Sequence, residues 1–345
     1  MSGVKTIGVL TGGGDCPGLN PVIRAVTRRA LDAGLTVIGL RDGWKGLIKG
    51  DAMPLDVNAV SGILHRGGTI LGSSRTNPYK NPEDVAQVKQ TIQKLKLDAL
   101  VPIGGEDTLG VATKLSKEGI QLVGVPKTID NDLSATDFTF GFDTAVNIAM
   151  EAIDRLHTTA ESHHRILVCE VMGRHAGWIA TYAGIAGGAD VILVPEEPID
   201  LDSVCDVVKK RRARGKNFSI IVVAEGAQFK QGADSKLSQP LDEFGHVRLG
   251  GIGDQLSKLV EQKTGYETRV TVLGHIQRGG SPTAFDRVLG TRFGVKAVDF
   301  ILEGKFGLMV SLQGNQIVGV PIEKGTGKLK TVDMDLYNLS KIFWS

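Results

Sequence analysis

Short apolar segments recur along this chain, most of them are followed within a few residues by glycine, and longer segments with the apolar spacing of a helix lie between them. The apolar segments of the first half are residues 6–10, 36–40, 99–103 and 122–125. Segments 21–33 and 84–96 have helical spacing. Alternation of strand, glycine turn and helix predicts an α/β fold in which helices cover both faces of a parallel sheet.

The same alternation restarts near residue 165, and 345 residues are enough for two domains. Apolar segments 165–171, 190–194 and 219–223 predict the strands of a second α/β domain. Segment 144–163 predicts a long helix that links the two domains. Glycine supplies 45 of the 345 residues, in short clusters, as in turns where the backbone approaches a ligand.

Composition argues against several classes of protein. A formal net charge of +2 predicts no attraction to nucleic acid or to an anionic membrane. We see no run of about 18 apolar residues and no signal peptide, and we expect a cytoplasmic protein. Cys16, Cys169 and Cys205 are too few for a disulfide framework and lack metal-ligand spacing, so we expect reduced thiols.

Two glycine segments suit phosphate, and each also has a plainer interpretation. Gly12–Gly14 follow the first strand and would present backbone N–H groups to phosphate oxygens, although a simple turn explains them equally well. Glu106 and Asp107 follow Gly104–Gly105 and predict a magnesium-phosphate site. A helix cap is the alternative there. Neither a Rossmann fingerprint nor a Walker A lysine is present.

Segment 126–132, Pro-Lys-Thr-Ile-Asp-Asn-Asp, indicates catalysis more strongly. It places a lysine, a hydroxyl, an amide and two carboxylates directly after a buried strand. A carboxylate can remove the proton of a sugar hydroxyl, and a lysine can stabilise the charge of a phosphoryl group. Basic residues also follow a strand in segment 172–175 and lie near a glycine pair in segment 269–280, where they suit the dianion of a sugar phosphate.

Together these segments resemble the phosphofructokinase family over nearly the whole chain, most specifically in 126–132, 172–174 and 273–280. The resemblance implies two Rossmann-like α/β domains with the active site in the cleft between them. Residues 1–141 plus about 277–303 would bind the phosphoryl donor. Residues 142–276 plus 304–345 would bind fructose 6-phosphate.

The resemblance also implies roles for individual residues. Asp130 resembles the base that deprotonates the sugar 1-hydroxyl, while Arg174 and Lys127 would stabilise the transferring phosphoryl group. Gly13, Asp107, Thr108 and Lys127 would bind the donor, and Glu106 would bind Mg²⁺. The implied sugar-phosphate contacts are Thr128, Asp130, Asp132, Arg165, Met172, Gly173, Arg174, Glu225, Arg269, His275 and Arg278. Arg165 resembles an arginine that reaches a neighbouring subunit, which implies a homodimer or homotetramer.

Asp107 and Lys127 predict inorganic pyrophosphate as the donor. Members of the family that use ATP typically have glycine at the position of Asp107, and many have glycine at the position of Lys127. A carboxylate at Asp107 would repel the α-phosphate of a nucleotide by roughly 4 kcal/mol at about 4 Å and an effective dielectric near 20. This is on the order of a thousandfold in affinity.

Other functions remain open at this point. An ATP-dependent phosphofructokinase that tolerates Asp107 is the alternative enzyme. A sugar-phosphate sensor on the same fold needs no base, which disfavours it because Asp130 and Arg174 are present. A nicotinamide dehydrogenase is disfavoured by the missing glycine fingerprint. NAD and lipid kinases share a glycine-glycine-aspartate loop but do not explain segment 273–280.

Overall fold

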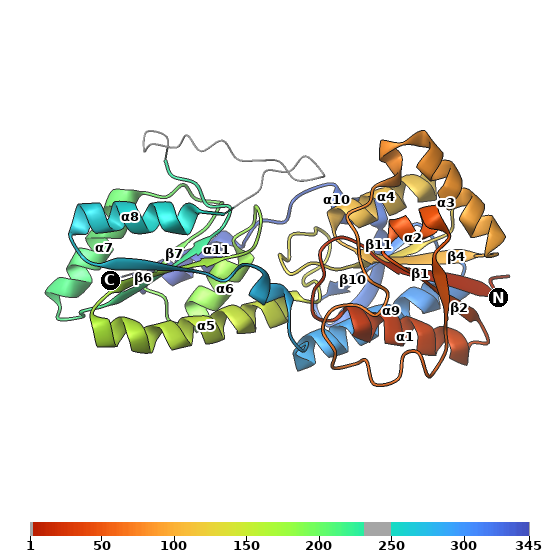
Figure 1. Ribbon diagram of the computed structural model, residues 1–345, viewed down its shortest axis with the longest axis horizontal. Coiled ribbons are helices and arrows are strands. Elements are labelled where there is room, and N and C mark those ends of the chain that lie inside the picture. Colours follow the sequence, from red (N-terminus) through yellow and green to blue (C-terminus); the bar gives the residue numbers. More distant parts are fainter. Residues whose placement is uncertain (1–2, 231–249, 345) are drawn as a thin grey trace. The chain divides into compact units, whose positions relative to one another are not determined.

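The computed structural model describes residues 3–230 and 250–344 and divides into two compact units (Figure 1). Unit 1 comprises residues 1–129, 133–144 and 278–329. Unit 2 comprises residues 130–132, 145–277 and 330–345. Each unit is an α/β fold built on a sheet of its own, as the sequence predicted.

Unit 1 contains a seven-stranded sheet in the order β11-β10-β5-β4-β1-β2-β3. Its strands are β1 (Thr6–Thr11), β2 (Thr36–Leu40), β3 (Ala52–Leu55), β4 (Ala99–Gly104), β5 (Val123–Pro126), β10 (Leu308–Gln313) and β11 (Gln316–Pro321). The five central strands are parallel, whereas β3 and β11 pair antiparallel at the edges. The carboxyl ends of β1, β4 and β5 therefore lie at one edge of the sheet, where the three predicted phosphate and catalytic segments begin.

Helices cover this sheet on both faces (Figure 1). They are α1 (Leu19–Asp32), α2 (Trp44–Lys49), α3 (Pro82–Lys94), α4 (Glu106–Lys117), α9 (Ala284–Leu302) and α10 (Ile322–Thr326), with the 3₁₀ helix η1 (Pro78–Lys80). α1 and α9 pack against each other on one face, where Gly294 allows their backbones to approach closely. On the other face, Leu10, Trp44 and Leu109 belong to a fully buried apolar cluster.

Unit 2 contains a four-stranded parallel sheet in the order β7-β8-β6-β9. Its strands are β6 (Ile166–Val171), β7 (Val191–Leu193), β8 (Ser219–Ala224) and β9 (Thr268–Val272). Its helices are α5 (Phe142–His163), which begins in unit 1, α6 (Trp178–Ala186), α7 (Leu201–Ala213), α8 (Ile252–Thr264), η2 (Gly274–Arg278) and α11 (Met334–Lys341). Figure 1 shows α7 and α8 on one face of the sheet and α5 and α6 on the other. Val168 and Ile221 of the sheet and Leu256 of α8 are fully buried in one apolar cluster.

The structure corrects one predicted domain boundary. We assigned residues 304–345 to the second domain, but residues 304–329 belong to unit 1. The reason is that β10 pairs with β5 through Leu308↔Val123 and Met309↔Gly124 and so extends the sheet of unit 1. Of residues 304–345, those from 330 onward belong to unit 2. There Tyr337 of α11 donates a hydrogen bond to the carbonyl of Ile192 at 3.1 Å.

Within residues 3–230 and 250–344, no helix is both long and apolar enough to cross a membrane. The three cysteines are free and buried, as expected for reduced thiols. Burial raises the pKa of the Cys16 thiol to about 12, so this thiol stays protonated at neutral pH.

Candidate active site

A backbone-lined loop follows β1 in unit 1. Gly13 has a φ of +82°, which favours glycine, and its N–H donates a hydrogen bond to the carbonyl of Ser74 at 3.0 Å. Its carbonyl accepts a hydrogen bond from Ser73 Oγ at 2.5 Å, and Gly12 N–H donates to the Ile103 carbonyl at 2.9 Å. Hydrogen bonds thus hold the backbone of this loop on both sides.

Two buried side chains surround this loop. Lys127, at the end of β5, is only 4% exposed, and its ammonium donates a hydrogen bond to the Gly14 carbonyl. A Cβ atom at Gly13 would lie 3.5 Å from Lys127 Nζ. Thr108 is also 4% exposed, and its Oγ1 would lie 2.5 Å from a Cβ atom at Gly12. The structure therefore brings together the predicted donor residues Gly13, Thr108 and Lys127.

Glu106 and Asp107 are the first two residues of α4. Glu106 is exposed, Asp107 is half-buried, and the N-cap residue Gly105 makes no side-chain capping bond. Carboxylates at this end of a helix are stabilised by its dipole, so the structure keeps both the structural and the metal-binding interpretation open. In the described part of the chain, no group of three or more His, Cys, Asp or Glu side chains could hold a metal ion. Mg²⁺, which needs only one or two carboxylates beside substrate phosphates, fits this donor set.

The predicted catalytic segment, residues 126–132, passes from unit 1 into unit 2. Thr128 is buried in unit 1, and its carbonyl accepts a hydrogen bond from Thr139 Oγ1 at 2.8 Å. Asp130, 4% exposed, belongs to unit 2 together with Asp132, whose carbonyl accepts the Lys330 N–H at 2.9 Å. Asn131 between them has a φ of +51°, a left-handed conformation that is uncommon for a side-chain-bearing residue. Such strain is often found at functional sites.

A second loop with left-handed backbone follows β6 in unit 2. Gly173 has a φ of +147° and Arg174 a φ of +52°. Both N–H groups donate to Glu225 Oε1, at 3.3 and 3.1 Å, and Met172 N–H donates to Gln277 Oε1 at 2.8 Å. Glu225 was predicted as a sugar contact, and here its carboxylate fixes the loop that carries Arg174.

Gln277 was not predicted as a functional residue. It is fully buried and joins the end of η2 to the loop after β6. Its place between His275 and Arg278, within a motif that we singled out, was the available signal. His275 is exposed in η2, whereas Arg278 belongs to unit 1, where its guanidinium NH1 donates to the Asp15 carbonyl at 3.3 Å. The structure thus places Arg278 beside the glycine loop of unit 1.

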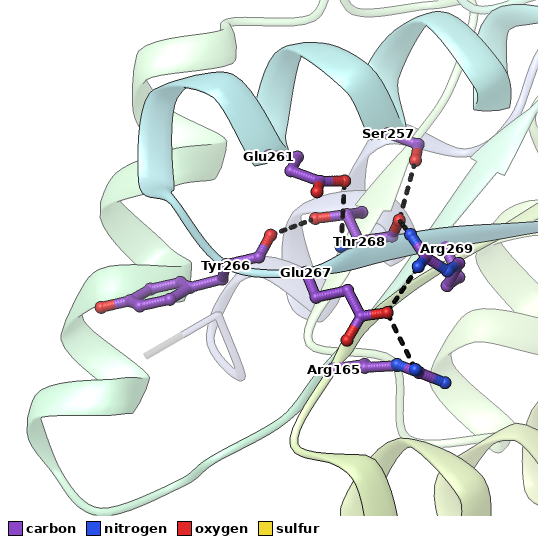
Figure 2. A network of polar contacts seen from close by, with 7 residues as sticks. All are labelled: Arg165, Ser257, Glu261, Tyr266, Glu267, Thr268 and Arg269. Atoms are coloured by element: carbon purple, nitrogen blue, oxygen red, sulfur yellow. Dashed lines mark hydrogen bonds and ion pairs between the residues drawn. The ribbon is translucent and has the colours of Figure 1, made fainter.

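Arg165 and Arg269 lie close together at the amino ends of β6 and β9 (Figure 2), whereas the Met172–Arg174 loop follows the carboxyl end of β6. Arg165 directly precedes β6, and Arg269 is the second residue of β9. Their guanidinium groups both contact Glu267 Oε1, at 2.8 and 2.5 Å. Arg165, and next Arg269, lower the pKa of Glu267, so this carboxylate is charged at neutral pH.

Comparisons with known proteins agree with this arrangement. The profile of the family described as Phosphofructokinase matches residues 6–301. A pyrophosphate–fructose 6-phosphate 1-phosphotransferase of Streptomyces coelicolor is 59% identical, over 98% of this chain and 99% of its own. An ATP-dependent 6-phosphofructokinase of the same organism is 54% identical, over 94% of this chain and 96% of its own.

A crystal structure of Pichia pastoris phosphofructokinase superposes with a TM-score of 0.83 at 32% identity. It covers 99% of this chain, which spans 37% of the Pichia chain. Family profile, near full-length relatives and three-dimensional structure all lead to the same assignment. The chain belongs to the phosphofructokinase family.

Proposed function

We propose that this protein transfers a phosphoryl group from inorganic pyrophosphate to the 1-hydroxyl of fructose 6-phosphate. The products are fructose 1,6-bisphosphate and phosphate, and the reaction is reversible. The observation that carries the choice of donor is Asp107, a half-buried carboxylate in the first turn of α4. Its negative charge disfavours the α-phosphate of a nucleotide, while pyrophosphate is short enough to avoid it.

The residues of unit 1 suit the donor. The buried ammonium of Lys127, beside the glycine loop, supplies positive charge without a large rearrangement. Preorganised positive groups of this kind stabilise the charge that spreads over a transferring phosphoryl group. Lys127 also offers a cation to the leaving phosphate, whose negative charge is confined to one phosphate group rather than spread over two.

The residues of unit 2 suit the acceptor. Asp130 accepts the proton of the 1-hydroxyl, and the oxygen of that hydroxyl forms a bond to one phosphorus atom of pyrophosphate. The bond between that phosphorus and the bridging oxygen breaks, and the bridging oxygen leaves with the second phosphate. Arg174, on the loop held by Glu225, stabilises the phosphoryl group in transit. Met172, Gly173, Glu225 and His275 bind the sugar phosphate.

Glu106 is the residue that we propose as the protein ligand of Mg²⁺. The exposed carboxylate can reach an ion whose remaining ligands are phosphate oxygens and water. The ion would neutralise phosphate charge during transfer.

We infer that Arg165 and Arg269 serve a neighbouring subunit in a homodimer or homotetramer. They lie at the amino ends of β6 and β9, whereas the Met172–Arg174 loop follows the carboxyl end of β6. The six residues of β6 span about 20 Å, which exceeds the length of one hexose phosphate. The arginine pair and that loop of one chain therefore cannot hold the same sugar phosphate. Free, buried cysteines support a reducing compartment such as the cytoplasm.

The alternative is an ATP-dependent enzyme. It is the less favoured one, because the ATP-dependent relative is 54% identical and the pyrophosphate-dependent relative is 59% identical. In the deciding experiment, fructose 1,6-bisphosphate formation is measured with fructose 6-phosphate and Mg²⁺, once with pyrophosphate and once with ATP. We expect activity with pyrophosphate and little with ATP. Preference for ATP would overturn the proposed donor but not the acceptor.

The variant Asp107→Gly tests the reason for this preference. Removing the carboxylate should raise ATP use by at least about tenfold if charge excludes the nucleotide. Asp84→Gly is the matched control, because Asp84 is also an acidic residue in the first turn of a helix, α3, of unit 1. Equal ATP use by both variants would contradict the role of Asp107.

A further inference from the structure

The contact between Arg165, Glu267 and Arg269 is built on a firmly held piece of backbone. Glu267 directly precedes β9, and its carbonyl accepts the Ile166 N–H at 3.0 Å. On the α8 side, Glu261 accepts the Thr268 N–H at 3.3 Å, and Ser257 Oγ donates to the Thr268 carbonyl at 3.5 Å (Figure 2). The backbone of Glu267 is thus tied to β6 on one side and, through its neighbour, to α8 on the other.

One oxygen of this carboxylate contacts both cations. Arg165 NH2 lies 2.8 Å and Arg269 NH2 lies 2.5 Å from Glu267 Oε1. Two guanidinium groups this close repel each other unless an anion lies between them, and the carboxylate supplies that anion. The three side chains together retain a charge of +1, so the cluster still attracts an anion.

The side chains are exposed enough to receive a ligand. The exposed fractions are 31% for Arg165, 40% for Glu267 and 55% for Arg269. An exposed arginine with no partner would sample many rotamers, and ordering it on binding would cost side-chain entropy. Glu267 removes part of that freedom before any ligand arrives.

We propose that Glu267 is a positioning residue, which holds Arg165 and Arg269 together as one receptor for the phosphate group of the sugar substrate. This inference rests on the proposed function, in which both arginines bind sugar phosphate. Each guanidinium has several donors, so both can contact a phosphate while they keep the carboxylate contact. The carboxylate itself touches no substrate.

The test compares Glu267→Gln with wild type in the full-length enzyme. The amide keeps the shape and one acceptor oxygen but loses the charge. We expect KM for fructose 6-phosphate to rise about tenfold, because the arginines are no longer pre-arranged, while kcat and KM for pyrophosphate stay unchanged. Glu303→Gln is the matched control, since Glu303 pairs with Lys305 at 2.8 Å and is 43% exposed, and it should leave all three constants unchanged. An unchanged or lower KM for fructose 6-phosphate in Glu267→Gln would overturn the proposal.

A mutant cycle tests whether Glu267 affects sugar-phosphate binding through Arg165 and Arg269 or in some other way. If Glu267 acts by positioning them, Glu267→Gln should have no further effect on KM in a chain that already carries Arg165→Ala and Arg269→Ala. A second tenfold rise in that background would contradict positioning.

Direct binding of fructose 6-phosphate, measured by calorimetry without a donor, distinguishes failure of this inference from failure of the proposed function. A weaker Kd in Glu267→Gln supports the inference even if neither pyrophosphate nor ATP is used. If the two Arg→Ala changes weaken binding but Glu267→Gln does not, the sugar-phosphate assignment stands and this inference fails. If the Arg→Ala changes leave Kd unaltered, both fail.

Discussion

The two units of the molecule hold their functional groups in different ways. In unit 1, Lys127 and Thr108 are almost fully buried, and the glycine loop between them is fixed by backbone hydrogen bonds. In unit 2, Arg165, Arg269 and His275 are partly or largely exposed, and carboxylates or an amide hold the groups that we assign to the sugar phosphate.

This difference indicates how each of the two substrates would be recognised. Pyrophosphate has no carbon skeleton and offers only charge and oxygen atoms, so a rigid site with a buried cation suits it. A sugar phosphate is longer and offers hydroxyls as well, and long side chains can follow its shape. We therefore expect substitutions in unit 1 to change donor kinetics and substitutions in unit 2 to change acceptor kinetics.

The largest effect is expected from a substitution of Asp130. This residue falls outside the division between donor binding and acceptor binding, because its substitution would change the chemical step. Asp130→Asn should lower kcat by about 10³-fold, because the amide cannot accept the hydroxyl proton, while both KM values stay within about twofold. Steady-state kinetics in the direction of bisphosphate formation measures this. Asp206→Asn, at an exposed position of α7, is the control. A loss seen mainly in KM would assign Asp130 to binding instead.

Burial in unit 1 also predicts a pH dependence of stability. Asp286 of α9 is fully buried, and burial raises its pKa from 3.8 to about 6, although Thr144 donates two hydrogen bonds to it. The folded state thus keeps the proton to higher pH than the unfolded state. The resulting stabilisation is complete below about pH 3.8 and is lost as pH rises through about 6. Over this window the loss amounts to about 3 kcal/mol.

Asp286→Asn should remove this dependence. The thermal midpoints of the variant and of wild type are measured between pH 4 and 8. As pH rises to about 6, the midpoint of the variant should increase relative to that of wild type, and at higher pH the two curves should run parallel. The absolute difference includes a constant contribution from the buried amide, so the slope is the informative quantity. Parallel curves from pH 4 onward would show that the carboxyl titrates normally.

Much of the fold was predictable because its signals are local. The seven buried strands that we predicted are present, within one or two residues of the observed bounds, since continuous apolar segments followed by glycine are typical of parallel strands. β3, β9, β10 and β11 were missed. Three of them lie at sheet edges, where partly exposed strands mix polar and apolar residues and give no continuous apolar run. The resemblance set the boundary at residue 304, and the sequence showed no pattern that would correct it, because β10 is placed by its pairing with β5, which is distant in sequence.

The site shows the same limit. The sequence alone singles out Lys127, Asp130 and Arg174 as candidates, because each belongs to a motif directly after a strand. The pairing of Arg165 with Arg269 could not, because it depends on the register of β6 against β9, Leu167↔Arg269. The side-chain direction of Arg278, toward the Asp15 carbonyl, likewise depends on packing that no motif encodes.

A substitution in the glycine loop tests the donor role that we propose for unit 1. A methyl group at Gly12 would lie 2.5 Å from Thr108 Oγ1, so the loop or Thr108 must move. Gly12→Ala should therefore raise KM for pyrophosphate by about 30-fold, as overpacking of about 2 kcal/mol would, and leave KM for fructose 6-phosphate unchanged. Gly110→Ala in α4 is the control, since its methyl group would meet nothing within 4 Å. An equal rise in both KM values would mean that the loop serves both substrates.

The smallest effect is expected from the corresponding change in unit 2, at Gln277. Gln277→Leu keeps the apolar bulk but leaves the Met172 N–H without its acceptor, which lies 2.8 Å away in the wild type. Loss of one such bond, worth about 1 kcal/mol, should raise KM for fructose 6-phosphate about fivefold and leave KM for pyrophosphate unchanged. Gln262→Leu, exposed on α8, is the control. Because Gln277 follows His275 closely in η2, a rise in the pyrophosphate KM instead would show that this segment belongs functionally with Arg278 and the glycine loop, and the division of labour between the units would have to be redrawn there.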